Sequence, residues 1–212
     1  MGFSRGPKIV TNGLVLALDA GSKKSYPGSG AIWYDLSGND YFDLTNGMTY
    51  NTSSNGGMSL DGTNSRASSP TFFTSNYWSE NGDWTIESFH RIDGSVGVNG
   101  RSAIFANQRY RSETSNGGPG GFGLNIYPIY GGSYCMNLTH DDGNGTTTSY
   151  EAHTYIPIVT GSDVHITYTW DGENTTARAY KNGVLETTTT NSSFKWSPRS
   201  YGVNTRIGTS TQ

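Results

Sequence analysis

Aromatic residues that stand beside arginine or in glycine-rich stretches are the residues of this chain best suited to hold a saccharide. Three aromatic residues fit this description, Tyr110, Tyr130 and Trp196, and with the arginines on either side of Tyr110, Arg109 and Arg111, they make a set of five. A sugar ring has apolar faces that stack on an exposed aromatic ring, while its hydroxyl groups need polar partners close by. We therefore take these five as candidate glycan-binding residues. The alternative is that each ring packs beneath its own loop, because large aromatic side chains are often partly buried.

Oxygen-bearing side chains in the polar stretch 141–149 are the candidate metal ligands. Asp141, Asp142 and Asn144 offer the carboxylate and amide oxygens that calcium prefers. The stretch lacks the Asp-x-Asp-x-Asp-Gly spacing of a dedicated calcium loop, so a solvated loop is the alternative interpretation. Calcium at these three residues is the one cofactor that the sequence leaves open, and otherwise no cofactor is expected.

Acid–base catalysis needs carboxyl groups at a defined separation, and the spacing of the acids argues against it. A retaining glycosidase holds two carboxyl groups about 5–5.5 Å apart, which on one strand means acids two residues apart. Glu87 stands alone in its strand candidate, and Asp93 follows that strand. Residues 118–123 formally fit G-x-G-x-x-G, but a strand candidate rather than a helix follows them, which argues against dinucleotide binding. The histidines are scattered, with His90 and His165 expected to be structural, and we predict a protein that is not an enzyme.

The stretch 164–186, VHITYTWDGENTTARAYKNGVLE, must provide part of the framework. From Val164 to Trp170 apolar residues alternate with polar ones, which is the period of a strand with one buried face. Turn residues follow at 171–174, and Asn182-Gly183 is the strongest short-range signal for a hairpin, because a type I′ turn needs positive φ at both central positions. This stretch therefore predicts a three-stranded antiparallel meander.

Further strand candidates occur along the rest of the chain, and Gly, Pro or Asn interrupts every window that approaches helical spacing. The candidates are 13–20, 41–50 with a turn at Asn46-Gly47, 57–69 with a turn at Asp61-Gly62 between its two extended parts, 84–92, 102–107, 122–129, 134–140 and 201–207. The apolar run 13–20 is expected to be a strand buried on both faces, and Trp33, Trp84 and Trp170 are expected in the core. Many short strands separated by turn signals predict an all-β fold, an antiparallel β-sandwich of the jelly-roll type.

Length and composition limit the organisation and the partners of the chain. A sequence of 212 residues is expected to form an N-terminal arm, 1–12, and a single sandwich domain, 13–212. The net charge of −3 and the absence of a basic cluster argue against nucleic-acid binding. The apolar run 14–18 is too short for a signal-peptide core or a membrane helix, so membrane insertion is not expected.

A series of motifs follows one another in an order typical of a known class of domain. They are GLVLALDAG (13–21), SYPGSGAIWYDLSGND (25–40), LTNGMTY (44–50), GGMSLDGTNSRASS (56–69), DWTIESFHRI (83–92), VHITYTWDG (164–172) and AYKNGVLE (179–186). This order resembles the concanavalin A-like, laminin-G-like jelly-roll domains, and within them the version found in structural proteins of tailed bacteriophages. The most specific part is FSRGPKIVTNGLVLALDAGSKKSYPGSG (3–30). Such domains usually have one more strand after the motif at Ile207-Gly208. The resemblance implies either that the sequence is a fragment of a longer protein or that this final strand is absent, which would leave an edge open to a neighbouring strand.

The resemblance implies a non-enzymatic virion component, displayed as a capsid decoration or as part of a tail or fibre appendage and assembled in the host cytoplasm. Its partners would be other virion proteins in a multicopy particle. Weak binding to cell-surface glycans would then be strengthened by the number of copies. The alternative is a carbohydrate-binding lectin module of a larger bacterial surface protein. A glycan hydrolase that acts through Glu87 is a third hypothesis.

Overall fold

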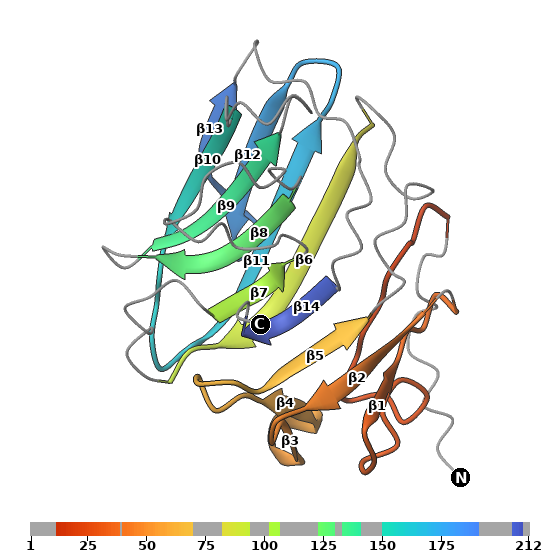
Figure 1. Cartoon of the computed structure of the whole chain (residues 1–212). Helices are drawn as coiled ribbons and strands as arrows, with labels where there is room; N and C mark the ends of the chain where they lie inside the picture. Colours follow the sequence, from red (N-terminus) through yellow and green to blue (C-terminus); the bar gives the residue numbers. More distant parts are fainter. Residues whose placement is uncertain are drawn as a thin grey trace, which may run out of the picture.

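The computed structural model describes residues 12–38, 40–69, 82–93, 102–106, 123–129, 133–140, 150–190 and 205–209 (Figure 1). These residues form fourteen β-strands and one short 3-10 turn, and they contain no α-helix. Accordingly, no helix within these ranges has the length and hydropathy of a membrane span. The prediction of an all-β fold is confirmed.

The larger sheet is antiparallel and has eight strands in the order β1-β2-β5-β14-β7-β8-β9-β10. Its strands are β1 (Ile32–Tyr34), β2 (Tyr41–Thr45), β5 (Arg66–Ser69), β7 (Ser102–Ala106), β8 (Gly123–Ile129), β9 (Ser133–His140), β10 (Tyr150–Pro157) and β14 (Thr205–Thr209). The strand latest in sequence, β14, pairs with β5 on one side and with β7 on the other. It therefore joins the early strands of the chain to the central ones.

The smaller sheet has four antiparallel strands in the order β13-β12-β11-β6. They are β6 (Trp84–Arg91), β11 (Asp163–Asp171), β12 (Thr176–Lys181) and β13 (Val184–Thr190). The predicted meander is β11-β12-β13 and is confirmed, since Asn182 and Gly183 have φ values of 50° and 80° in the turn between its last two strands. A separate two-stranded sheet pairs β3 (Thr49–Asn51) with β4 (Gly57–Ser59) across the 3-10 turn η1 (Ser53–Asn55).

The outer strand β13 departs from regular pairing with β12. The register shifts between Ala179 and Tyr180, which leaves a bulge in the ladder. Lys181 and Glu186 form an ion pair of 3.2 Å beside this bulge. The hydroxyl of Thr187 donates to the backbone carbonyl of Tyr155 in β10 at 2.8 Å. This bond connects β13 to the edge of the eight-stranded sheet.

The two large sheets pack around one cluster of buried side chains. On β11 the alternating residues predicted to face inward are at most 2% exposed, which confirms the predicted period of two. The buried apolar residues are Ala20, Tyr26, Trp33, Phe42, Ala67, Phe105, Tyr134, Ile156, Val164, Ile166, Tyr168, Trp170, Ala177 and Ala179. They come from both sheets, and Trp84 packs against them. The arrangement is the predicted antiparallel sandwich.

Residues 13–20 do not form the predicted strand. Their backbone bonds to a side chain and a turn instead of to a neighbouring strand: Ala17 donates to the Asp35 carboxylate at 2.7 Å and accepts from the backbone of Leu36 at 2.8 Å. Three apolar side chains of the run still pack against the core. The prediction of burial on both faces is therefore wrong, since residues 14–18 are only partly buried, and an apolar pattern alone does not decide which groups satisfy the backbone.

Candidate functional site

The ligand-binding residues proposed from the sequence all lie outside the described residues. They are the glycan-binding candidates Arg109, Tyr110, Arg111, Tyr130 and Trp196 and the calcium candidates Asp141, Asp142 and Asn144. Both sets stay predictions. The structure does describe the four-stranded sheet completely, and its outward face combines aromatic and polar side chains.

Strand alternation brings five side chains together on this outward face. Because neighbouring residues of a strand point to opposite sides, the residues between the buried positions of β11 point away from the core. His165 lies opposite Phe89 of β6, and Thr167 lies between Glu87 of β6 and Tyr180 of β12. We call these five residues the Phe89 face.

The side chain of Phe89 is the most open part of this face. It is 74% exposed, although it belongs to the interior of a regular strand. The carboxylate of Glu87 lies 3.5 Å from Nε2 of His165, and these two side chains are 62% and 38% exposed. The ring therefore has a hydrogen-bond acceptor and an imidazole as neighbours, all within reach of solvent.

His165 is held in place through its backbone. Its N–H donates to the side-chain oxygen of Asn182 at 3.0 Å, and its carbonyl accepts from the Asn182 N–H at 2.8 Å. The imidazole of His165 faces outward and meets Glu87, and the expectation of a structural histidine stays a prediction for this residue. The hairpin turn that the sequence identified at Asn182 positions this end of the Phe89 face.

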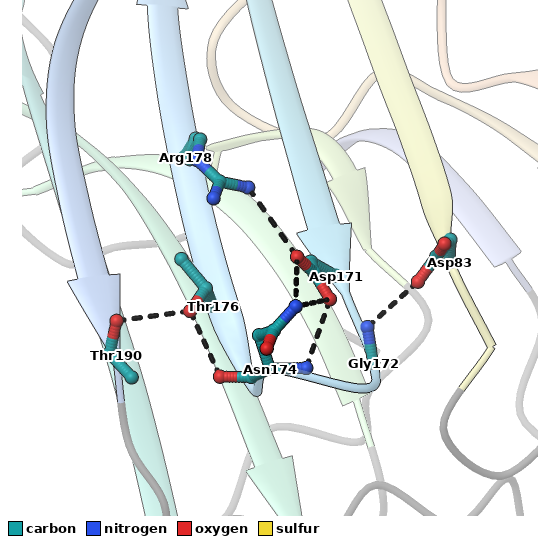
Figure 2. Close-up of polar contacts among 7 residues, drawn as sticks. All are labelled: Asp83, Asp171, Gly172, Asn174, Thr176, Arg178 and Thr190. Atoms are coloured by element: carbon teal, nitrogen blue, oxygen red, sulfur yellow. Dashed lines mark hydrogen bonds and ion pairs between the residues drawn. The ribbon is translucent and has the colours of Figure 1, made fainter.

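Figure 2 shows the opposite end of the sheet, where a turn joins β11 to β12. The Asp171 carboxylate accepts from the backbone N–H of Asn174 at 2.9 Å and from its side-chain amide at 3.0 and 3.1 Å. These hydrogen bonds lower the pKa of Asp171, with a smaller contribution from Arg178, whose guanidinium lies 3.8 Å away. Asp83, just before β6, accepts from the Gly172 N–H at 2.9 Å and ties the turn to that strand.

A second pair of contacts in Figure 2 closes the same end of the sheet toward β13. The hydroxyl groups of Thr176 and Thr190 lie 3.0 Å apart, and Thr176 also donates to the backbone carbonyl of Asn174 at 2.9 Å. The polar groups of this turn are therefore engaged with one another. These hydrogen bonds order the turn at this end of the outward face, next to the partly exposed Arg178.

Two acids lie at different places on the outward side of this sheet. Hydrogen bonds from Asn174 favour the ionised form of the Asp171 carboxyl and lower its pKa. Glu87 lies opposite Thr167, four residues along β11 from Asp171. Among the described residues, no three His, Cys, Asp or Glu side chains form a group that could hold a metal ion. The surface can stack a ring and exchange hydrogen bonds with it.

The eight-stranded sheet presents a second outward group. Tyr34 and Tyr41 are cross-strand partners and are 46% and 43% exposed. Farther along the sheet, Arg206 is only 8% exposed, and burial together with the positive charge of Arg66 lowers its pKa. The two tyrosines are a second surface on which a sugar could stack, while Arg206 is too enclosed to be a first point of contact.

His90 lies between the sheets, as predicted for a structural histidine. Its Nε2 is 2.9 Å from the hydroxyl of Tyr134 in the opposite sheet, and its Nδ1 is 3.0 Å from the hydroxyl of Ser88. Burial lowers the pKa of His90 to about 4 and raises the pKa of Tyr134 to about 12. The imidazole is therefore neutral in the folded protein at neutral pH.

Comparison with known proteins shows similarity at the level of the fold. No protein-family model matches the chain, and no curated protein matches it significantly in sequence. Domain 4 of the extracellular arabinanase AbnA from Geobacillus stearothermophilus, solved with arabinotriose, is 17% identical with a TM-score of 0.51, covering 84% of this chain and 87% of that domain. This likeness shows a shared β-sandwich fold, which agrees with the predicted concanavalin A-like class.

Two more distant structures are also carbohydrate-binding modules by name. The CBM40 module of the Ruminococcus gnavus IT-sialidase, bound to α2,3-sialyllactose, is 18% identical with a TM-score of 0.43, and the match covers 58% of this chain and 61% of that one. The module CBM66 from Bacillus subtilis is 18% identical with a TM-score of 0.36, covering 79% and 89%. The chain thus spans about three fifths of the length of the sialidase module.

Proposed function

We propose that this protein is a glycan-binding module and that the Phe89 face is its binding surface. The observation that carries the proposal is the open ring of Phe89 beside Glu87 and His165. The apolar face of a sugar stacks on such a ring, and its hydroxyl groups can donate to the carboxylate and exchange hydrogen bonds with the imidazole. A flat sheet face suits an extended saccharide chain better than a single enclosed sugar.

The shared fold supports this proposal. The arabinanase domain with the same sandwich fold was solved with arabinotriose. A single stacking ring with a few hydrogen bonds gives weak affinity, so useful binding would come from several copies presented together. Arabinotriose and α2,3-sialyllactose are therefore reasonable first probes on a glycan array, next to plant and bacterial polysaccharides.

The test compares variants on both sheets. We expect Phe89→Ala to weaken binding of the best array glycan about tenfold, because aromatic stacking contributes roughly 0.5–1.5 kcal/mol. Leu185→Ala removes an exposed apolar side chain from β13, at the other edge of the sheet, and should weaken binding less than Phe89→Ala does. Titration calorimetry or NMR chemical-shift mapping gives the affinities.

A variant of the tyrosine pair on the eight-stranded sheet tests whether the glycan binds there instead. If Tyr41→Ala abolishes binding while Phe89→Ala does not, the glycan site lies on the eight-stranded sheet instead. A wild-type protein that binds nothing on the array would remove the proposal altogether.

We further propose that the module is displayed on a bacteriophage particle, as a capsid decoration or in a tail or fibre appendage. The motif order described above supports this role, in particular the stretch 3–30. The alternative, a lectin module of a larger bacterial surface protein, predicts a secretion signal or further domains in the parent gene. Cryo-electron microscopy of intact particles separates the two, since only the first places density of this sandwich on a virion.

A further inference from the structure

Among the described strands, β6 is an edge of the four-stranded sheet. It pairs with β11 on one side over an uninterrupted register from Trp84 to Arg91, and no described strand pairs with its other side (Figure 1). An edge strand presents a row of backbone N–H and C=O groups to an incoming strand. β6 contains no proline, bulge or lysine that would hinder pairing, and its charged side chains on the outward face, Glu87 and Arg91, have opposite signs.

The outward side chains of β6 are complementary to themselves. Along one face they read Thr85, Glu87, Phe89 and Arg91. If two copies of β6 pair antiparallel with Phe89 opposite Phe89, then Glu87 of each copy lies opposite Arg91 of the other. Directly opposed aromatic pairs and opposite charges both stabilise a sheet. Glu87 and Arg91 are 62% and 51% exposed, and their ion pairs within the chain, to His165 and Asp93, are also exposed, so a partner strand could exchange for them.

Other registers of the same pairing are less favourable. A shift of two residues in each strand in one direction places Glu87 opposite Glu87, and in the other direction it places Arg91 opposite Arg91. Like charges directly opposite each other destabilise a sheet. A shift of one residue in each strand, in either direction, keeps the outward faces together but removes both Glu87–Arg91 pairs and the Phe89–Phe89 pair. A shift of only one strand by one residue would turn the outward side chains of one strand against the inward side chains of the other. The charges thus favour the register centred on Phe89.

We propose that β6 is a self-association edge, through which two copies of this chain form a symmetric dimer with one continuous eight-stranded sheet. The contact is isologous, as expected for a twofold dimer. The pairing uses the backbone edge of β6 and leaves the outward faces open, so the two Phe89 faces become neighbours on one surface. One strand pair is small beside the ~800 Å² that each partner contributes to a standard interface, so the dimer should depend on concentration.

Sedimentation velocity of the full chain without any sugar tests this proposal. The wild type should pass from monomer to dimer between about 1 µM and about 1 mM. Glu87→Arg and Arg91→Glu should each weaken dimerisation at least tenfold, because each places like charges opposite one another. The double variant should restore it. Glu173→Arg, the same charge change in an exposed turn, should leave dimerisation unchanged.

Several outcomes would overturn the proposal. One is a wild type that stays monomeric up to about 1 mM, and in that case protection of the β6 amides from hydrogen exchange would show that a segment of the same chain covers the edge. Another is dissociation in both single variants without recovery in the double variant, which would exclude this register. Circular dichroism checks that each variant is folded. The readout contains no glycan, so its failure leaves the proposed function standing, and the reverse also holds.

Discussion

The contacts of His90 show how one residue connects the two sheets. The hydrogen bond to Tyr134 crosses the interior, and burial lowers the pKa of His90 to about 4 from its ordinary value of 6.5. The unfolded chain therefore binds a proton at His90 between these two pH values, while the folded chain does not. The contribution of neutral His90 to the free energy of unfolding is fully present above pH 6.5 and is lost as the pH falls toward 4.

This difference gives a prediction for acid stability. We expect the free energy of unfolding to fall by about 3 kcal/mol between pH 7 and pH 4, since each pKa unit corresponds to about 1.36 kcal/mol. Urea unfolding at several pH values measures it. His90→Gln should flatten the pH dependence in this window. The lowered pKa of Asp171 acts at a lower pH, because its contribution is lost only below its ordinary value of 3.8.

Asp61 illustrates a residue whose role lies in a turn. Its carboxylate accepts from the backbone N–H groups of Thr63, Asn64 and Ser65 and from the Ser65 hydroxyl. These hydrogen bonds hold the pKa of Asp61 well below its usual range. The Asp-Gly signal at 61–62 predicted a turn here, and the structure shows the bonds that close it.

At the scale of the element, Gly208 in β14 is the position where the fold tolerates least change. Its φ is +107°, and a Cβ atom there would lie 2.4 Å from a methyl group of Leu60 and 2.5 Å from the backbone oxygen of Ser65. We expect Gly208→Ala to cost more than about 2 kcal/mol and to lower Tm by roughly 5 °C or more. Gly57→Ala is the control, since no atom lies within 4 Å and its φ is ordinary. A thermal melt of both variants decides the matter.

The strands that could be predicted from the sequence are those with a clear period of two or a specific turn. The meander from β11 to β13 is the best example, because alternation and the Asn182-Gly183 turn agree. β1 was missed because it has only three residues. β10 was missed because its sequence, YEAHTYIP, mixes polar and apolar residues without a clear period. The run 13–20 was assigned wrongly because its backbone partners are side chains and a turn distant in sequence.

The proposed site was missed because loops were searched and strand faces were not. Loops often contain binding residues, so exposed aromatics were sought there. A signal for Phe89 was present: Trp84 and Ile86 lie on the inward side of β6, and Phe89 is out of phase with both. Strict alternation therefore predicts an outward phenylalanine. The closeness of Glu87 to His165 could not be predicted without the register between β6 and β11.

On the scale of the whole molecule, the sandwich has two outward surfaces with different character. One bears the Phe89 face, and the other bears Tyr34 and Tyr41 with the enclosed Arg206. The core between them is shared by both sheets, and bonds such as Thr187 to Tyr155 connect their edges. A ligand bound on one surface and a particle attached to the other would therefore not compete for the same side chains.

The bulge between Ala179 and Tyr180 makes the β13 edge of the smaller sheet unfavourable for pairing with a strand of another copy. At this edge the pairing of β13 with β12 is irregular, and Lys181 and Glu186 form an ion pair. Thr187 is hydrogen-bonded to Tyr155 of the eight-stranded sheet. An incoming strand cannot pair regularly with β13, in contrast to β6. If copies associate through the smaller sheet by way of β6 alone, this route ends at two molecules.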